Sequence, residues 1–195
     1  MMHAAIRLIR DEHRSISAVL RAANFVVDKA HSSGDTPDFE LLRAMLYYLR
    51  EFPERRHHPN EDRVLFAQIK ARTREADGII AELRQEHERG DEMLRVLEMA
   101  LDRWREGARD GARQFSEVLS GYTRFHHAHM EKEETLVLPA AERALSSEDW
   151  HEIYSAFESN QDPMFGTDTA NEFRDLFSRI IRLAPRPART EKPRG

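Results

Sequence analysis

Apolar residues recur at steps of three and four along most of the chain, and this spacing predicts amphipathic α-helices. The alternation of apolar and polar residues that would indicate strands is missing from the sequence. We therefore predict an all-α fold built on four bundled helices. The four helices are expected at about residues 4–29, 38–69, 73–106 and 111–145. Pro53 and Pro59 interrupt the second of them, which must restart or bulge there because proline disturbs a helix interior.

Two shorter amphipathic helices are expected after residue 145. Ser147 is expected to cap the first of them. Their apolar residues are Trp150, Ile153, Tyr154 and Phe157 in the first, and Phe173, Leu176, Phe177, Ile180 and Ile181 in the second. We expect a bundle over residues 1–145, a helical extension over 146–183 and a disordered, proline-rich tail over 184–195. The extension would pack on the bundle or form a dimer contact, so a monomer and a homodimer both stay open.

Polar residues interrupt the apolar stripes at places that repeat along the chain. His13 stands in the stripe of the first helix, and His87 stands in the stripe of the third helix, 74 residues later. The second and fourth helices each carry a His-x-x-x-Glu motif, and the motifs are 72 residues apart. The two motifs are His57/Glu61 and His129/Glu133. The two halves of the chain thus resemble each other, which predicts a bundle with approximate two-fold symmetry.

These repeated residues are suited to bind metal together. Residues four apart lie on one helix face, so each motif presents a nitrogen and an oxygen in the same direction. Imidazole with carboxylate suits iron, manganese or zinc, and a carboxylate that can bridge two ions favours a pair. Taken alone, a histidine in an apolar stripe is more often a hydrogen-bonded core residue, and a His/Glu pair more often lies at the surface. The recurrence of all these features at nearly one offset favours a single shared metal site.

The composition excludes several classes of site. The chain has no cysteine, which rules out disulfides, thiolate metal sites and cysteine nucleophiles. The net charge is -5 with both signs mixed, unlike the clustered basic face of a nucleic-acid-binding protein. No stretch approaches a membrane span, and the N-terminal residues become charged too early for a signal peptide. We therefore expect a cytoplasmic protein that binds neither nucleic acid nor membrane.

The motifs resemble those of the hemerythrin family, also called the HHE cation-binding domain, over about residues 4–145. The segments that carry the resemblance are residues 11–13, 52–62, 85–87 and 129–139. The resemblance implies an up-down-up-down bundle around two non-heme iron ions with an oxo or hydroxo bridge. The metal ligands that it implies are His13, His57, His87 and His129 as terminal ligands, with Glu61 and Glu133 as bridges.

One position departs from the hemerythrins that carry oxygen. Those carriers have a second histidine four residues after the one on the third helix, and here that residue is Asp91. Two six-coordinate irons held by four histidines, two bridging carboxylates and a bridging oxygen keep two positions open. Asp91, His126 or water could fill one of them, although Asp91 is expected rather at the surface. His58 and His127 are expected to point elsewhere, because each lies about 100° round the helix from its neighbour.

Three functions stay open from the sequence. The first is binding or sensing of oxygen, nitric oxide or iron, and the second is a di-iron enzyme acting on peroxide or nitric oxide, or an iron donor in iron–sulfur cluster repair. Open coordination positions favour reactivity, but the sequence shows no dedicated proton donor or substrate pocket. The third is a ferritin-like carboxylate protein, whose Glu-x-x-His pairs would be Glu54/His57 and Glu148/His151. These pairs do not fall at repeat-related positions, which argues against the third function.

Overall fold

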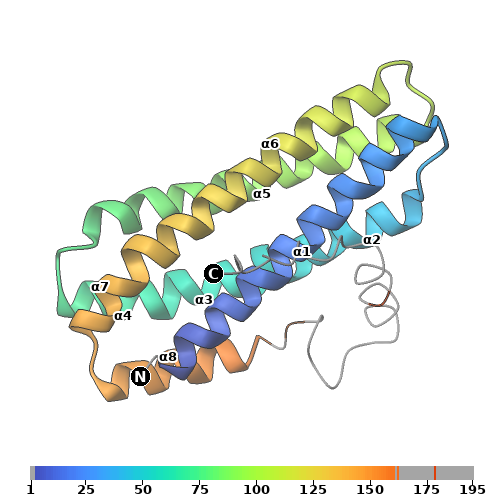
Figure 1. The fold of residues 1–195 in the computed structure, drawn as a ribbon. Helices are drawn as coiled ribbons and strands as arrows, with labels where there is room; N and C mark the ends of the chain where they lie inside the picture. Colours follow the sequence, from blue (N-terminus) through green and yellow to red (C-terminus); the bar gives the residue numbers. More distant parts are fainter. Residues whose placement is uncertain (1–2, 161, 163–177, 179–195) are drawn as a thin grey trace, which may run out of the picture.

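A computed structural model describes residues 3–160, 162 and 178, and its four long helices alternate in direction (Figure 1). The first bundle helix is α1 (Ala4–Ser33), and the third is α5 (Asp77–Arg105). The second comprises α2 (Phe39–Leu49), the π-helical segment η1 (Arg50–His57), α3 (His58–Asn60), the π-helical segment η2 (Glu61–Leu65) and α4 (Phe66–Arg72). The fourth comprises α6 (Gly111–Lys132), the π-helical segment η3 (Glu133–Val137) and α7 (Leu138–Ala144), and α8 (Ser147–Glu158) follows it.

Each bundle helix packs against two others. The α1 helix contacts α2 on one side and α6 on the other, and α5 likewise contacts α2 and α6. Among the described residues the secondary structure is helical and contains no strand. The predicted all-α bundle is therefore confirmed.

The turn between the first two bundle helices follows from local chemistry. Gly34 ends α1 in the left-handed conformation (φ 73°), and its N–H donates to the carbonyl of Ala30. Only glycine adopts this conformation without steric cost. Asp38 then caps α2 by accepting a hydrogen bond from the Leu41 N–H at 2.9 Å. The start of the second helix near Asp38 is as predicted.

The second and fourth bundle helices widen where their motifs lie. Hydrogen bonds in the π-helical segments span five residues rather than four, as in the bond from the His58 N–H to the carbonyl of Pro53. Pro59 and Pro139 each follow such a wide turn, which accommodates the clash that proline makes with the preceding α-helical turn. Of the two alternatives left open for the prolines, a restart or a bulge, the structure shows the bulge, and the other half of the chain carries a matching one.

In the part of the chain that the structure describes, the apolar core consists of two clusters with a polar layer between them. One cluster fills the end of the bundle near the 34–38 turn and includes Leu42, Leu97 and Phe115. The other fills the opposite end and includes Ile80 and Phe157. Buried histidines and glutamates occupy the layer between the clusters. Because buried charge is costly unless it is paired, this layer needs an internal source of compensation.

The extension helix α8 packs on the bundle along α1 and η2. Its capping residue is Ser146, whose hydroxyl accepts a hydrogen bond from the Asp149 N–H, so the prediction of Ser147 as the cap is wrong by one residue. A cap needs an extended backbone, which Ser146 has (φ -78°, ψ 169°), whereas Ser147 is already helical. Trp150 and Phe157 of α8 are buried in the second core cluster.

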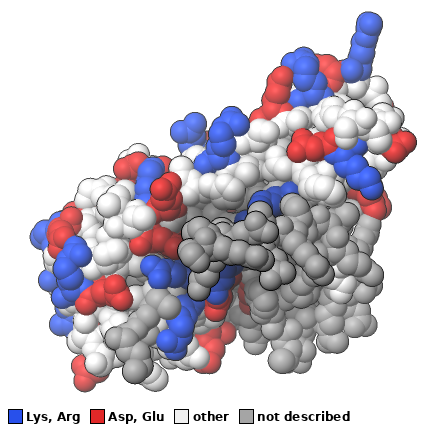
Figure 2. Space-filling model, in the orientation of Figure 1, with Lys and Arg blue, Asp and Glu red and all other residues white. Residues whose placement is uncertain are grey.

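The remaining C-terminal predictions fall on residues that the structure does not describe, Ser178 aside. These are the helix expected within residues 173–181 and the tail over 184–195. Within the described part of the chain, none of the helices combines the length and the apolar character needed to cross a membrane. Figure 2 shows Lys and Arg side chains interspersed with Asp and Glu on the described part of the face that it presents.

Asp149 fastens α8 to the second bundle helix. Its Oδ2 accepts hydrogen bonds from the Ser146 N–H at 2.8 Å and from Arg72 Nε at 2.9 Å, and its Oδ1 accepts from Arg72 Nη2 at 2.9 Å. The Arg72 guanidinium and the Ser146 N–H lower the pKa of Asp149 to about 2. The folded state therefore favours the carboxylate, and this stabilisation is lost as the pH falls through the folded pKa.

We expect Asp149→Asn to lower the melting temperature at neutral pH, because the substitution removes the charge that Arg72 and the helix N-terminus hold. The difference in melting temperature from wild type should be largest above about pH 5 and should shrink toward about pH 2. Thermal unfolding followed by circular dichroism over this pH range measures it. Glu148→Gln, at the exposed neighbouring position, is the control and should change little. A melting-temperature difference that stays constant across this pH range would contradict the explanation based on the Asp149 charge.

Candidate metal centre

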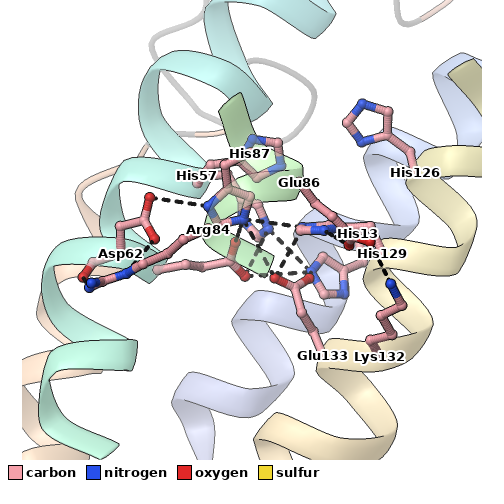
Figure 3. Close-up of polar contacts among 12 residues, drawn as sticks. His13, His57, Asp62, Arg84, Glu86, His87, His126, His129, Lys132 and Glu133 are labelled. Carbon is pink, nitrogen blue, oxygen red and sulfur yellow. Dashed lines mark hydrogen bonds and ion pairs between the residues drawn. The ribbon is translucent and has the colours of Figure 1, made fainter. Parts of the chain in front are cut away.

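The six predicted ligands come together in the polar layer between the two core clusters. All four bundle helices contribute to the group, and each side chain belongs to a residue that is at most 7% exposed (Figure 3). The residues are His13 from α1, His57 and Glu61 from the second bundle helix, His87 from α5, and His129 and Glu133 from the fourth.

The imidazole nitrogens form two close pairs. The Nε2 atoms of His13 and His57 are 3.2 Å apart, and those of His87 and His129 are also 3.2 Å apart. One pair comes from the first two bundle helices and the other from the last two, which is the division that the internal repeat predicts. Each pair can therefore offer two nitrogen ligands to one ion.

Glu61 and Glu133 lie between the pairs, and each divides its two oxygens between them. Glu61 Oε1 is 3.3 Å from His57 Nε2, and Glu61 Oε2 is 3.4 Å from His87 Nε2. Glu133 repeats the arrangement with the two remaining histidines, at 3.2 and 3.3 Å. Each histidine pair thus meets one oxygen from either carboxylate. These nitrogen and oxygen donors could hold metal ions.

The donor atoms of this layer fit a pair of cations. All four carboxylate oxygens of Glu61 and Glu133 are buried and lack a hydrogen-bond donor. Such groups are costly to bury unless a donor or a cation satisfies them. Two overlapping groups of side chains could each hold an ion, with ligand atoms within 4.8 Å of one another. They are His13, His57, Glu61 and Glu133 in one group, and His58, Glu61, His87 and His129 in the other.

Two further carboxylates orient one histidine of each pair. Glu12 accepts a hydrogen bond from His57 Nδ1 at 2.7 Å, and Glu86 accepts one from His129 Nδ1 at 3.0 Å. Each of these glutamates comes from the same half of the chain as the histidine that it holds. A carboxylate on Nδ1 fixes the tautomer that leaves Nε2 free for a metal, and it makes Nε2 a stronger donor.

Two more carboxylates orient the other histidines and link the halves of the chain. Asp62 accepts from His87 Nδ1 at 3.1 Å, and Glu134 accepts from His13 Nδ1 at 2.9 Å. Here the carboxylate and the histidine belong to opposite halves. All four histidines therefore turn Nε2 toward the centre and Nδ1 toward an acidic side chain.

These four supporting carboxylates were not predicted as site residues, although the sequence carries a signal for them. An acidic residue precedes both His13 and His87, and another follows both Glu61 and Glu133. Their recurrence at the offsets of the ligands themselves distinguishes them from ordinary surface acids.

The supporting carboxylates differ in what holds them. Asn160, just beyond α8, donates through Nδ2 to both oxygens of Glu12, at 3.1 and 3.2 Å. In the other half of the bundle, Lys132 pairs with Glu86 instead. A buried neutral amide and a partly exposed ammonium thus hold equivalent glutamates. The two halves of the layer are therefore electrostatically unequal.

The carboxylates of the layer favour positive charge among them. Burial by itself lowers the pKa of His57, but Glu61 and the other nearby carboxylates raise it to about 9. Against the same effect of burial, carboxylates raise the pKa of His129 to about 9 and that of His87 to about 12. The pKa of His13 also rises well above its usual value. The nearby carboxylates thus favour positive charge on these histidines, and metal cations would supply positive charge at the same place.

A comparison with protein families agrees with this geometry. The family model of the hemerythrin HHE cation binding domain matches residues 4–141, a span that contains all six predicted ligands. The chain belongs to this family. A search of curated proteins found no match. The hemerythrin match ends before α8, so Asn160 and its contact with Glu12 lie beyond the part of the chain that the family model covers.

Asp91 stands where oxygen-carrying hemerythrins have their additional histidine, and here it forms ion pairs away from the centre. Its carboxylate contacts Arg50 at 3.2 Å and also pairs with Arg95, and its side chain is 32% exposed. Asp91 thus lies at the surface, as expected. His127 is also exposed. Neither residue belongs to the two groups that could hold an ion.

His126 lies close to the layer but apart from the contacts that converge on the centre (Figure 3). It is buried, its Nε2 lacks a hydrogen-bond partner, and Glu54 Oε1 is 3.9 Å away. Glu54 contacts His58 rather than His57, and His151 is exposed. The two Glu-x-x-His pairs of a ferritin-like site are therefore not assembled in this hemerythrin bundle.

The prediction that His58 points away from the site is wrong. His58 is 4% exposed, and its ring stacks on that of His87 with centroids 4.3 Å apart. The helical turn does carry His58 off the face of His57, as expected. The second bundle helix, however, has α1 on one side and α5 on the other, so both faces are interior. His57 meets His13 of α1, and His58 meets His87 of α5.

Proposed function

We propose that this hemerythrin-family protein binds two iron ions and, through them, a small diatomic ligand, either oxygen or nitric oxide. One ion would be held by His13 and His57 and the other by His87 and His129, with Glu61 and Glu133 bridging both. The observation that carries the proposal is the division of four unpartnered carboxylate oxygens between two histidine pairs. Iron would supply the redox-active centre that binds a diatomic molecule, and the protein would supply its position and charge.

Burial supports a small ligand rather than a larger substrate. The six proposed ligand residues are each at most 7% exposed, and apolar clusters cover the layer from both ends of the bundle. A surface groove between α1 and α6 touches His13 and is also lined by Ser17, Met130 and Thr135. A molecule of two atoms can reach such a buried centre through modest side-chain motion, whereas a larger substrate would require the helices to separate.

The test is to load the full chain anaerobically with ferrous iron, count the iron and record the visible spectrum before and after adding oxygen or nitric oxide. We expect two irons per chain and a spectral change with one of these ligands that reverses when the ligand is removed. His129→Ala should bind less iron and lose the change. His151→Ala, at an exposed position on α8, should behave as wild type.

The possible outcomes separate the competing functions. A reversible spectral change supports binding or sensing of the ligand. Rapid consumption of peroxide or nitric oxide without a stable ligand-bound form would instead show an enzyme. Less than stoichiometric iron in the wild type, together with the same metal content in His129→Ala, would overturn the proposal.

A further inference from the structure

We infer that His58 is a fifth histidine ligand, bound to the ion of His87 and His129, and that the open coordination position lies on the other ion. The inference rests on the proposed iron pair. It replaces Asp91 and His126 as candidates for the additional ligand, since neither belongs to a group that could hold an ion. It also makes the centre asymmetric, although the repeat that builds it is nearly symmetric.

The position of His58 matches that of the other four histidines. One of its ring nitrogens lies within 4.8 Å of ligand atoms of Glu61, His87 and His129. Its Nδ1 is 3.3 Å from Glu54 Oε2, and a carboxylate on Nδ1 is also what orients each of the other four. With Nδ1 engaged in this way, Nε2 is the nitrogen left to bind a metal.

The surroundings of Glu54 are arranged to keep it beside His58. The Tyr122 hydroxyl donates a hydrogen bond to Glu54 Oε1 at 3.4 Å. A Cβ atom added at Gly90 would come within 3.3 Å of the same Glu54 oxygen. The missing side chain at Gly90 thus makes room for the buried carboxylate. A glycine in the stripe of a long helix otherwise lowers helix stability, and its place here is explained by this contact.

The other half of the bundle lacks the corresponding groups. The residue 72 positions after His58 is Met130, and the residue 74 positions before Gly90 is Ile16. Met130 is buried, lines the groove beside His13, and offers a thioether, a soft donor poorly suited to iron in a nitrogen and oxygen site. An imidazole with its carboxylate therefore stands beside one ion, and an apolar side chain stands at the equivalent place beside the other.

This difference decides which ion can take a ligand. The ion of His87 and His129 would have three histidines, two carboxylate oxygens and the bridging oxygen, which completes six positions. The ion of His13 and His57 would have two histidines with the same oxygens, which leaves one position free. The free position lies on the side of the bundle where the groove touches His13.

Zero-field Mössbauer spectroscopy of the iron-57-loaded full chain tests the inference on the wild type itself. We expect two quadrupole doublets of equal area, because the two irons would have different ligand sets. His58→Met, which copies the residue of the other half, should bring the doublets together. It should also weaken binding of one iron at least about tenfold, as measured by competition with a chelator. His151→Met, at an exposed position, should change neither result.

Each outcome has a definite meaning. A wild-type spectrum in which both irons give a single doublet overturns the role of His58 while leaving the iron pair intact. An unchanged spectrum and iron affinity in a folded His58→Met protein does the same. If His58→Met does not fold, the wild-type spectrum still decides. Two separate doublets of equal area support the inference, and a single doublet contradicts it. A wild type without iron refutes the proposed function instead.

Discussion

Glu133→Gln is expected to remove both iron ions from the protein rather than one. Glutamine keeps the shape of the side chain, but it offers a single oxygen and no charge, so it cannot bridge. Each histidine pair would keep one carboxylate oxygen from Glu61 and lose the other. We expect iron affinity to fall by at least about 100-fold, beyond the range seen when only a supporting contact is lost. Iron per chain after desalting, with chelator competition, measures this effect.

The control for this substitution lies on the same helix. Glu131 is exposed two residues earlier, and Glu131→Gln makes the same chemical change outside the layer. It should retain two irons per chain. If Glu133→Gln retains one tightly bound iron, the two metal positions are held independently, and the bridging role of Glu133 is contradicted.

Removing iron from the loaded protein is expected to lower its melting temperature by about 8–16 °C. A ligand at about a thousand times its dissociation constant stabilises the folded state by about 4 kcal/mol. For a chain of this size, 1 kcal/mol corresponds to about 2–4 °C. The ions also relieve the cost of the polar layer, where four carboxylate oxygens are buried without donors. Thermal unfolding with and without a chelator measures the difference.

The Glu133→Gln protein provides the control for this second prediction. Its melting temperature should be the same with and without the chelator, because it has no iron pair to lose. An equal drop in both proteins would show that the chelator acts in another way. A wild-type melting temperature that does not respond would mean that the protonated histidines compensate the layer as well as iron does.

Much of the fold followed from patterns that are local in the sequence. The apolar stripes at steps of three and four predicted the bundle helices, and Asp38 and Pro59 marked where the second helix starts and bulges. These features depend on helix periodicity and on hydrogen bonds within a few residues, which neighbouring residues control. The cap of α8 was misplaced by one residue because Ser146 and Ser147 have the same capping chemistry, and only the backbone conformation separates them.

The sequence by itself determined which six residues could form a shared site, because a repeat of candidate ligands at nearly one offset has no simple explanation in packing. Only the tertiary structure decided how these residues meet. It showed the division of carboxylate oxygens between histidine pairs and the reach of Asn160 to Glu12. It also placed His58 inside the bundle. The physical reason is that the apolar stripe of a helix indicates only one buried face. A helix with two neighbouring helices buries side chains on two faces. Contacts between helices also depend on side chains that are far apart in the chain.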